Sequence, residues 1–259
     1  MKTSPALDFG ALIAHLEEDK VLGRRGGILL AGSFVLSITI GLIGMLSPGL
    51  DWLTNIILLV VGSPILALMY ILGSVFILLV LQSFAQFYRE GKIFRNGLFG
   101  FMFGVEGVIA AMGFFYISYY VPTFRFVSNV IPPLIMGDVA DSMVFYIVLS
   151  GISFVSLLFS SIFYRRTFII LSTKSHVERF RKVGLLLLIG SLLMIDFSIA
   201  SLSLVPLSIV CYYLYAQTIT LESVWMPNQV LFVPILVGIM LFSIAWTLFS
   251  NNIHLIKGT

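Results

Sequence analysis

Charged side chains are scarce in this sequence. They make up 10% of its 259 residues, whereas a soluble domain carries roughly a quarter. A chain with so little charge and 59% hydrophobic residues is too apolar for water to be its main solvent. We therefore expect most of it to lie in lipid. No polar segment is long enough for a separate soluble domain, and the net charge of +3 forms no basic patch for a nucleic acid.

Cysteine is almost absent, since Cys211 is the only one in the sequence. A lone cysteine excludes an internal disulfide, and here it is more typical of a packed apolar residue than of a reactive thiol. His15, His176 and His254 are scattered, without carboxylates or thiolates at metal-ligand spacing. Phosphate-binding loops, nucleophile elbows and zinc motifs are also missing. The sequence thus favours a protein that is not an enzyme and needs no cofactor or metal.

Long hydrophobic runs are what the sequence does have. A helix rises 1.5 Å per residue and the hydrocarbon of a bilayer is about 30 Å thick, so about 20 apolar residues can span it. Six runs qualify, and they predict an all-α transmembrane bundle with helices at 26–46, 54–83, 97–121, 141–164, 183–203 and 228–250. We expect Pro64 to kink the second helix and Pro122 to close the third.

The orientation of these helices follows from the segment Arg165–Lys182. It lies between two apolar runs, and a short basic loop stays on the cytoplasmic side of a membrane. Its basic residues are Arg165, Arg166, Lys174, Arg179, Arg181 and Lys182. With six spans, 14 of the 15 basic residues fall on this side and only Arg125 falls outside. The sequence therefore predicts a multi-pass membrane protein with both termini in the cytoplasm.

Apolar character continues beyond the fifth run, which leaves a seventh helix as an alternative. Dividing 183–215 into two spans leaves about 16 residues each, which is below the usual spanning length. We therefore interpret 204–227 as a partly helical segment at the outer surface. Its tyrosines and Trp225 are the aromatic residues expected at a membrane interface.

The two ends of the chain lie outside the predicted spanning domain of residues 26–250. In residues 1–25, Phe9, Leu12, Ile13 and Leu16 follow the i, i+3, i+4, i+7 spacing of one helical face. This pattern favours a helix lying on the cytoplasmic membrane surface, and a frayed tail is the alternative. Residues 251–259 are expected to form a short cytoplasmic tail.

A faint repeat begins each odd-numbered helix. The segments are RRGGILLAG at 24–32, FRNGLFGFMFG at 94–104 and FRKVGLLLLIG at 180–190. Each has a basic residue, a glycine, and an apolar run that ends at another glycine. If the likeness is a true repeat, the bundle consists of three helical hairpins in parallel orientation. The alternative is that any inward-starting helix of this composition looks the same.

Two acidic residues lie inside predicted spans. Glu106 and Asp196 are about 14 and 20 Å from the inner edge of their helices, so both are near mid-membrane. An ionised carboxylate there costs about 2.5–3.5 kcal/mol, and acids in this position are candidates for a proton or cation site. The alternative is a neutral carboxyl that is hydrogen-bonded inside the bundle.

The third helix also carries a stripe of small residues. Gly97, Gly100, Gly104 and Gly107 fall on one helical face and allow another helix to approach closely in lipid. Glu106 points about 200° away from Gly104 at 100° per residue. The stripe predicts a contact inside the bundle, with a partner or oligomer interface as the alternative.

Apolar residues interleave with the charges of Arg165–Lys182, as in a helix attracted to anionic lipid. The six basic residues are therefore candidates for lipid contact at the inner surface, and a plain connector is the alternative.

Three blocks of the chain resemble a known family. They are LGRRGGILLAGSF, REGKIFRNGLFGFMFG and HVERFRKVGLLLLIGSLLMI, and together they extend over most of residues 20–200. They are similar to a mainly archaeal, multi-pass membrane family known as domain of unknown function 996. The resemblance implies an archaeal plasma-membrane protein and no activity. It carries over no catalytic residue, and no metal role, since the paired cysteines at the C-terminus of some members are absent here.

These observations favour a non-enzymatic scaffold or accessory subunit of a larger membrane assembly. Its expected partners are membrane lipids and either other membrane proteins or further copies of the chain, not nucleic acid. The alternative is a proton- or cation-coupled transporter of a small solute that uses Glu106 and Asp196. A third and weaker hypothesis is an enzyme that acts on lipids at the inner interface.

Overall fold

The computed structural model describes residues 9–46, 52–128, 136–194 and 221–256. Within these ranges, side chains are described for 14–40, 62, 64–110, 148, 149, 151–194 and 236–256. The helices are α1 (Phe9–Leu46), α2 (Trp52–Phe87), α3 (Gly91–Ser128), α4 (Met136–Ser175), α6 (Leu221–Asn252), a 3₁₀ turn η1 (Ile253–Leu255), and a further helix over residues 179–194. The predicted all-helical fold is thus confirmed for the described residues, which contain no strand.

Five of these helices are long and apolar enough to cross a membrane. The candidate spans are Ala14–Ile40, Pro64–Phe87, Gly91–Ala110, Gly151–Ser175 and Leu236–Leu255. The remaining predicted span, 183–203, is helical over 183–194, and residues 195–203 lie outside the described residues. A multi-pass membrane bundle is therefore shown, and the number of six spans stays a prediction. The outer segment predicted at 204–227 lies outside the described residues up to position 220, and its remainder belongs to α6.

The helices are longer than the apolar runs predicted. α4 has 40 residues and thus a length of about 60 Å, which exceeds the 40–45 Å of a whole bilayer. The prediction that the fourth helix ends at residue 164 was wrong, because Phe168 and Leu171 pack in the core and keep the chain helical beyond the apolar run. Pro122 likewise does not close α3, which continues to Ser128. Membrane helices tolerate proline where neighbouring groups satisfy the freed carbonyl.

Both ends of the described chain are joined to the bundle. Residues 9–25 form the first part of α1 and continue into its apolar part without a break. Their place at the membrane surface stays a prediction. At the other end, Ile253 and Ile256 are 1% and 0% exposed and belong to the core cluster, so part of the expected tail packs into the bundle.

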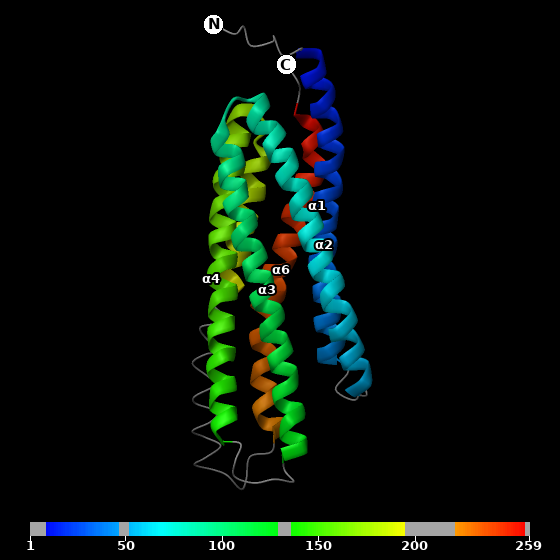
Figure 1. Cartoon of the computed structure of the whole chain (residues 1–259), viewed down its shortest axis with the longest axis vertical. Coiled ribbons are helices and arrows are strands. Elements are labelled where there is room, and N and C mark those ends of the chain that lie inside the picture. The colour runs from blue at the N-terminus through cyan, green and yellow to red at the C-terminus, as the bar shows by residue number, and fades with distance from the viewer. Residues whose placement is uncertain (1–8, 47–51, 129–135, 195–220, 257–259) are drawn as a thin grey trace, which may run out of the picture.

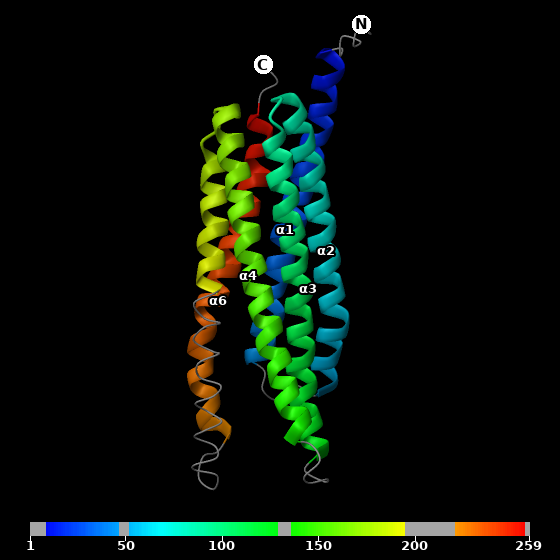
Figure 2. The ribbon, with the colours of Figure 1, turned by 60° about the vertical axis from the view of Figure 1, so that its left-hand side comes forward.

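The helices pack in chain order around a ring. α1 contacts α2 and α6, α2 contacts α3, and α3 contacts α4. Helix 179–194 completes the ring, because Gly184 lies against Arg165 of α4 and Gly190 lies against Gly238 of α6. Figures 1 and 2 show neighbouring helices running in opposite directions, with the start of α1 and the end of α6 at the same end of the bundle. We call this the terminal end.

Two turns at the terminal end share one backbone geometry. Arg89, between α2 and α3, and His176, after α4, have φ values of 50° and 57°, in the left-handed region that non-glycine residues rarely adopt. Four residues later, the N–H groups of Ile93 and Phe180 donate to the carbonyl three residues before them, at 3.0 and 3.3 Å. Both of those side chains are fully buried. The turns are thus related by a shift of 87 residues, from position 89 to position 176.

The same shift relates the buried faces of α2 and α4. The four pairs of core positions are Ile77 and Tyr164, Val80 and Thr167, Leu81 and Phe168, and Phe84 and Leu171. Beyond the turns, Gly97 and Gly184 also differ by 87 and both are buried. The units α2–turn–α3 and α4–turn–helix 179–194 therefore have matching burial patterns although their residue types differ. These units join an even-numbered helix to the next odd-numbered one, so the three hairpins expected from the sequence, each beginning with an odd-numbered helix, stay a prediction.

Aromatic rings fill the centre of the ring near the terminal end. Trp246 of α6 contacts Tyr164 and Phe168 of α4 in edge-on geometry, with centroids 5.3 and 6.0 Å apart. Phe249 lies 5.4 Å from Phe168, and Phe180 lies 5.9 Å from Phe249. All five side chains are at most 3% exposed. The interior is thus packed with aromatic rings from α4, α6 and helix 179–194.

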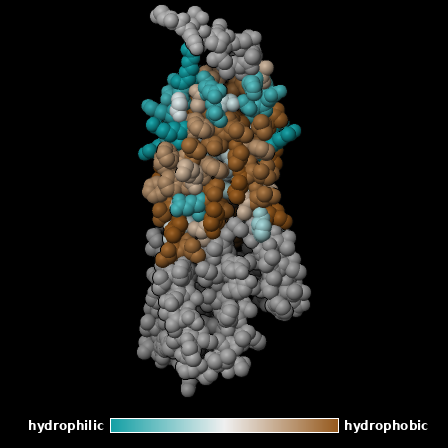
Figure 3. All heavy atoms as spheres, viewed as in Figure 1, coloured by the Kyte–Doolittle hydropathy of each residue, from teal (hydrophilic) through white to brown (hydrophobic). Residues whose placement is uncertain are grey.

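Basic residues gather at the terminal end. They are Lys20, Arg24, Arg25, Arg89, Lys92, Arg95, Arg165, Arg166, Lys174, Arg179, Arg181 and Lys182. Among the described residues, the one basic residue elsewhere is Arg125, near the far end of α3. Figure 3 shows hydrophilic residues collected there and a mainly apolar surface next to them. The charge separation that the sequence predicted is therefore present along the bundle axis.

Candidate functional site

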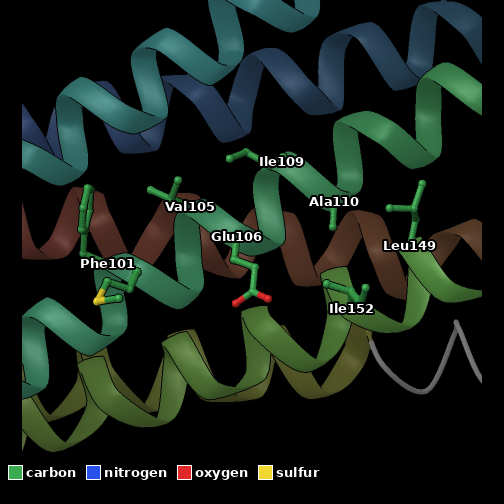
Figure 4. A pocket seen from close by; sticks show the side chains of 8 residues that line it. Phe101, Val105, Glu106, Ile109, Ala110, Leu149 and Ile152 are labelled. Carbon is green, nitrogen blue, oxygen red and sulfur yellow. The ribbon is translucent and has the colours of Figure 1, made fainter.

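Glu106 lies on an exposed apolar flank of α3. It lines a shallow groove of about 650 Å³ together with Phe101, Met102, Val105, Ile109, Ala110, Leu149 and Ile152. Figure 4 shows its side chain leaving α3 on the side of α4, which supplies the last two of these residues. Met102 and Ile109 are 56% and 62% exposed, so the groove opens sideways from the bundle rather than into its interior.

The carboxylate of Glu106 makes no hydrogen bond or ion pair with any residue that the structure describes. Arg95 is the nearest basic residue along α3 and lies eleven residues, or about 16 Å, toward the terminal end. With a hydrocarbon thickness of about 30 Å, Glu106 is near mid-membrane if Arg95 lies at the interface. The sequence left open a neutral carboxyl that is hydrogen-bonded inside the bundle. Glu106 is instead exposed and has no such hydrogen bond to a described residue.

Phenylalanine rings close the seam between α3 and α4 on the terminal side of the groove. Phe99 and Phe163 are 5.3 Å apart, Phe103 and Phe163 are 5.7 Å apart and nearly parallel, and Phe103 and Phe159 are 5.4 Å apart. Arg166 lies over the ring of Phe163 at 5.9 Å. On α3, Phe99, Phe103 and Glu106 follow i, i+4, i+7 spacing. We call the four rings the phenylalanine ladder, and the groove begins where it ends.

The glycine stripe lies on the opposite side of α3, inside the bundle. A Cβ built at Gly97 would lie 2.6 Å from Leu81 of α2, and one at Gly100 would lie 3.0 Å from the ring of Tyr164 of α4. Ser160 donates a hydrogen bond to the carbonyl of Gly100 at 2.7 Å.

The lower half of the stripe has the same surroundings. Gly104 lies against the hydroxyls of Tyr70 and Ser160, and Gly107 lies against Leu157. Ser153 donates to the carbonyl of Gly107 at 3.0 Å. The four glycines are therefore occupied by α2 and α4 and do not form an exposed interface.

Asp196 lies outside the described residues, so its distance from Glu106 stays untested. Among the side chains that the structure describes, no three His, Cys, Asp or Glu residues are grouped closely enough to hold a metal ion. Tyr70, in the core beside Gly104, is hydrogen-bonded to the side chains of Ser74 and Ser160. These polar groups satisfy one another and do not reach the groove.

The segment Arg165–Lys182 is not a loop. Residues up to Ser175 are helical, a turn follows at 176–178, and helix begins again at 179. The prediction of a connecting loop was wrong, because buried residues such as Phe168 and Phe180 pack both helix ends into the core. All six basic side chains are nevertheless exposed at the surface, namely those of Arg165, Arg166, Lys174, Arg179, Arg181 and Lys182.

Two polar contacts at the terminal end could not be predicted from the sequence. Arg179 donates to the side-chain oxygen of Asn252 at 2.8 Å, and Lys174 lies 4.0 Å from a carboxylate oxygen of Glu90. Each joins segments more than 70 residues apart, and nothing in the local sequence marks them. At the turn after α2, burial raises the pKa of Tyr88, so its hydroxyl remains protonated near neutral pH.

Comparison with known proteins gives one match. Residues 69–200 match a family described as protein of unknown function, DUF996, over half of the chain from α2 to helix 179–194. This confirms the resemblance stated from the sequence, although its first block, at 22–34, lies before the matched region. No curated protein and no solved structure matches the chain.

Proposed function

The chain belongs to the DUF996 family of proteins of unknown function, and on that premise we propose that it is a non-enzymatic scaffold or accessory subunit of a membrane protein assembly. It is an integral membrane protein with several apolar helices. The proposal places it in the plasma membrane of an archaeal cell, with the terminal end in the cytoplasm.

The placement of Glu106 supports this proposal most directly. A transporter needs a polar path that reaches its coupling acid from within the bundle. Glu106 instead lines an apolar groove on the outer flank, and polar groups of the described core nearby, such as Tyr70 and Ser160, are hydrogen-bonded to each other and do not line that groove. An acid on a lipid-facing flank is better satisfied by another protein than by a solute in transit.

The basic residues at the terminal end support attachment to the inner membrane surface. Arg165 lies ten residues, or about 15 Å, before the end of α4, and Arg95 lies four residues, or about 6 Å, after the start of α3; both side chains are exposed. In the proposed orientation these side chains contact anionic lipid head groups, and the helix ends beyond them project into the cytoplasm.

Isolation of the tagged full-length chain from its own membrane in mild detergent tests the proposal. We expect a particle larger than the monomer, which contains a second membrane protein at constant stoichiometry and is recovered again when that second protein carries the tag. A monomer without a stoichiometric companion would contradict the proposal. Proton-coupled flux in vesicles that is abolished by Glu106→Gln would favour the transport alternative.

A further inference from the structure

We propose that the groove around Glu106 is the docking site for a transmembrane helix of another subunit, and that this helix carries a lysine or arginine at mid-membrane depth. The inference rests on the proposed function and specifies how the subunit binds its partner. Three features carry it: the unpaired carboxylate, the depth at which that carboxylate lies, and the shape of the flank.

The charge of Glu106 defines the chemistry of the occupant. The carboxylate has no partner among the described residues and is surrounded by apolar side chains such as Met102 and Ile109. A lone carboxylate and a lone ammonium or guanidinium group each cost about 2.5–3.5 kcal/mol at the centre of a membrane helix. When the two meet in the groove, each relieves the cost of the other, so a cationic helix gains more than an apolar one.

A second copy of the chain does not supply this cation. The described basic residues lie at the terminal end, apart from Arg125, which is 19 residues or about 28 Å from Glu106 along α3. A copy in the same membrane orientation would present its own Glu106, or apolar residues, at the depth of the groove. Lipid head groups in contact with Arg165 also remain short of the carboxylate, because the neighbouring Tyr164 lies against Gly100, six residues or about 9 Å before Glu106. The charge must therefore come from a different chain.

The shape of the flank fits a helix that approaches through the lipid. The phenylalanine ladder closes the α3–α4 seam as far as Phe103 and Phe159. Below it, Leu149 and Ile152 of α4 line the groove beside Glu106, and the 40% exposure of Ile152 shows that the seam is open there. A partner helix can thus lie along the ladder and insert one long basic side chain where the rings end.

The test uses the full-length chain in lipid vesicles, with Cys211→Ser and a donor dye on His176→Cys, an exposed residue of a turn. Three leucine-rich synthetic helices carry an acceptor and differ only at their central residue, which is lysine, leucine or glutamate. Energy transfer reports association. We expect the lysine helix to associate about tenfold more strongly than the leucine helix, since an interhelical polar contact in a membrane contributes about 1–2 kcal/mol. The glutamate helix should not show this gain.

Two variants separate the groove from charge alone. Glu106→Gln should lower the affinity for the lysine helix to that for the leucine helix, while gel filtration and thermal unfolding show the same fold. Glu106→Gln combined with Met240→Glu moves the acid to an exposed position of α6 that does not line this groove, and should not restore the preference. If the double variant regained the preference for the lysine helix, the proposed site would be wrong. It would also be wrong if Glu106→Gln by itself kept that preference. Association between two labelled copies that requires Glu106 would assign the groove to a second copy and also overturn it.

The native assembly distinguishes failure of this inference from failure of the proposed function. If Glu106→Gln retains the native partner in full, the docking site is wrong and the proposed function stands. If the wild-type chain isolates alone while its preference for the lysine helix holds, the proposed function is wrong and the docking chemistry stands. If the wild-type chain retains the native partner and the Glu106→Gln variant loses it, the docking site and the proposed function are both supported.

Discussion

Gly190 and Gly238 bring helix 179–194 and α6 together backbone to backbone. A Cβ built on Gly238 would lie 2.7 Å from the carbonyl oxygen of Gly190, and one built on Gly190 would lie 2.9 Å from that of Gly238. No side chain larger than hydrogen fits at either position without a shift of backbone. In lipid there is no hydrophobic driving force between helices, so the van der Waals packing that this close approach allows stabilises their association.

Gly238→Ala should therefore weaken this contact. We expect the free energy of unfolding to fall by about 1–3 kcal/mol, because the added methyl forces the two backbones apart. The measurement is thermal unfolding of the purified chain in detergent.

Gly151→Ala is the matched control, since a Cβ there would meet nothing within 4 Å. It should leave stability unchanged or raise it by up to about 1 kcal/mol, as alanine favours helix over glycine. Equal effects of the two substitutions would show that the close approach does not stabilise the bundle.

The aromatic cluster at the terminal end should contribute more than any single glycine contact. Trp246 is 3% exposed and contacts Tyr164, Phe168 and Phe249. Trp246→Ala removes these contacts and leaves a cavity, so we expect a loss of about 3–5 kcal/mol. Ile244→Ala, on the same helix at a position that is 46% exposed, should change stability little. A small loss for Trp246→Ala, measured by the same unfolding assay, would contradict the packed centre.

Asn252 should hold the end of α6 to helix 179–194. Its amide oxygen accepts from Arg179 at 2.8 Å and its amide nitrogen donates to the carbonyl of Leu248 at 2.6 Å, while the side chain is 2% exposed. Asn252→Ala removes this hydrogen bond while the exposed Arg179 can still bind water, and we expect a loss of about 0.5–1.5 kcal/mol.

Limited proteolysis from the cytoplasmic side, in the proposed orientation, reports the same contact. Cleavage near the end of α6 should be faster in Asn252→Ala than in Asn251→Ala, whose exposed neighbouring side chain has no such contact. Identical cleavage rates in the two variants would show that the Arg179 contact does not anchor this end.

Hydrophobic run length and charge bias predicted the helices and their shared terminal end well. Both signals are local, since about 20 apolar residues span a bilayer wherever they occur. The prediction failed at helix ends, as in Arg165–Ser175. Those residues look polar in sequence, yet every third or fourth one, such as Phe168, packs into the core and extends the helix.

The sequence predicted the outward direction of Glu106 but not the groove around it. Helical geometry placed Glu106 away from the glycine stripe, and the structure has it on the outer flank. Whether that flank would be covered by another helix of the chain depends on contacts between α3 and α4, including the stacking of Phe103 on Phe159. Such pairings join residues more than 50 positions apart and leave no mark in spacing or composition.

Sidedness of the two terminal-end turns tests the central claim most directly. Gly91→Cys and His176→Cys, each in a Cys211→Ser background, place single thiols at exposed positions next to Arg89 and in the second turn. An impermeant maleimide applied to intact cells should label neither, and both should react once the membrane is opened. Labelling of one thiol but not the other in intact cells would contradict a bundle whose basic end lies on one side of the membrane, and labelling of both would contradict its cytoplasmic orientation.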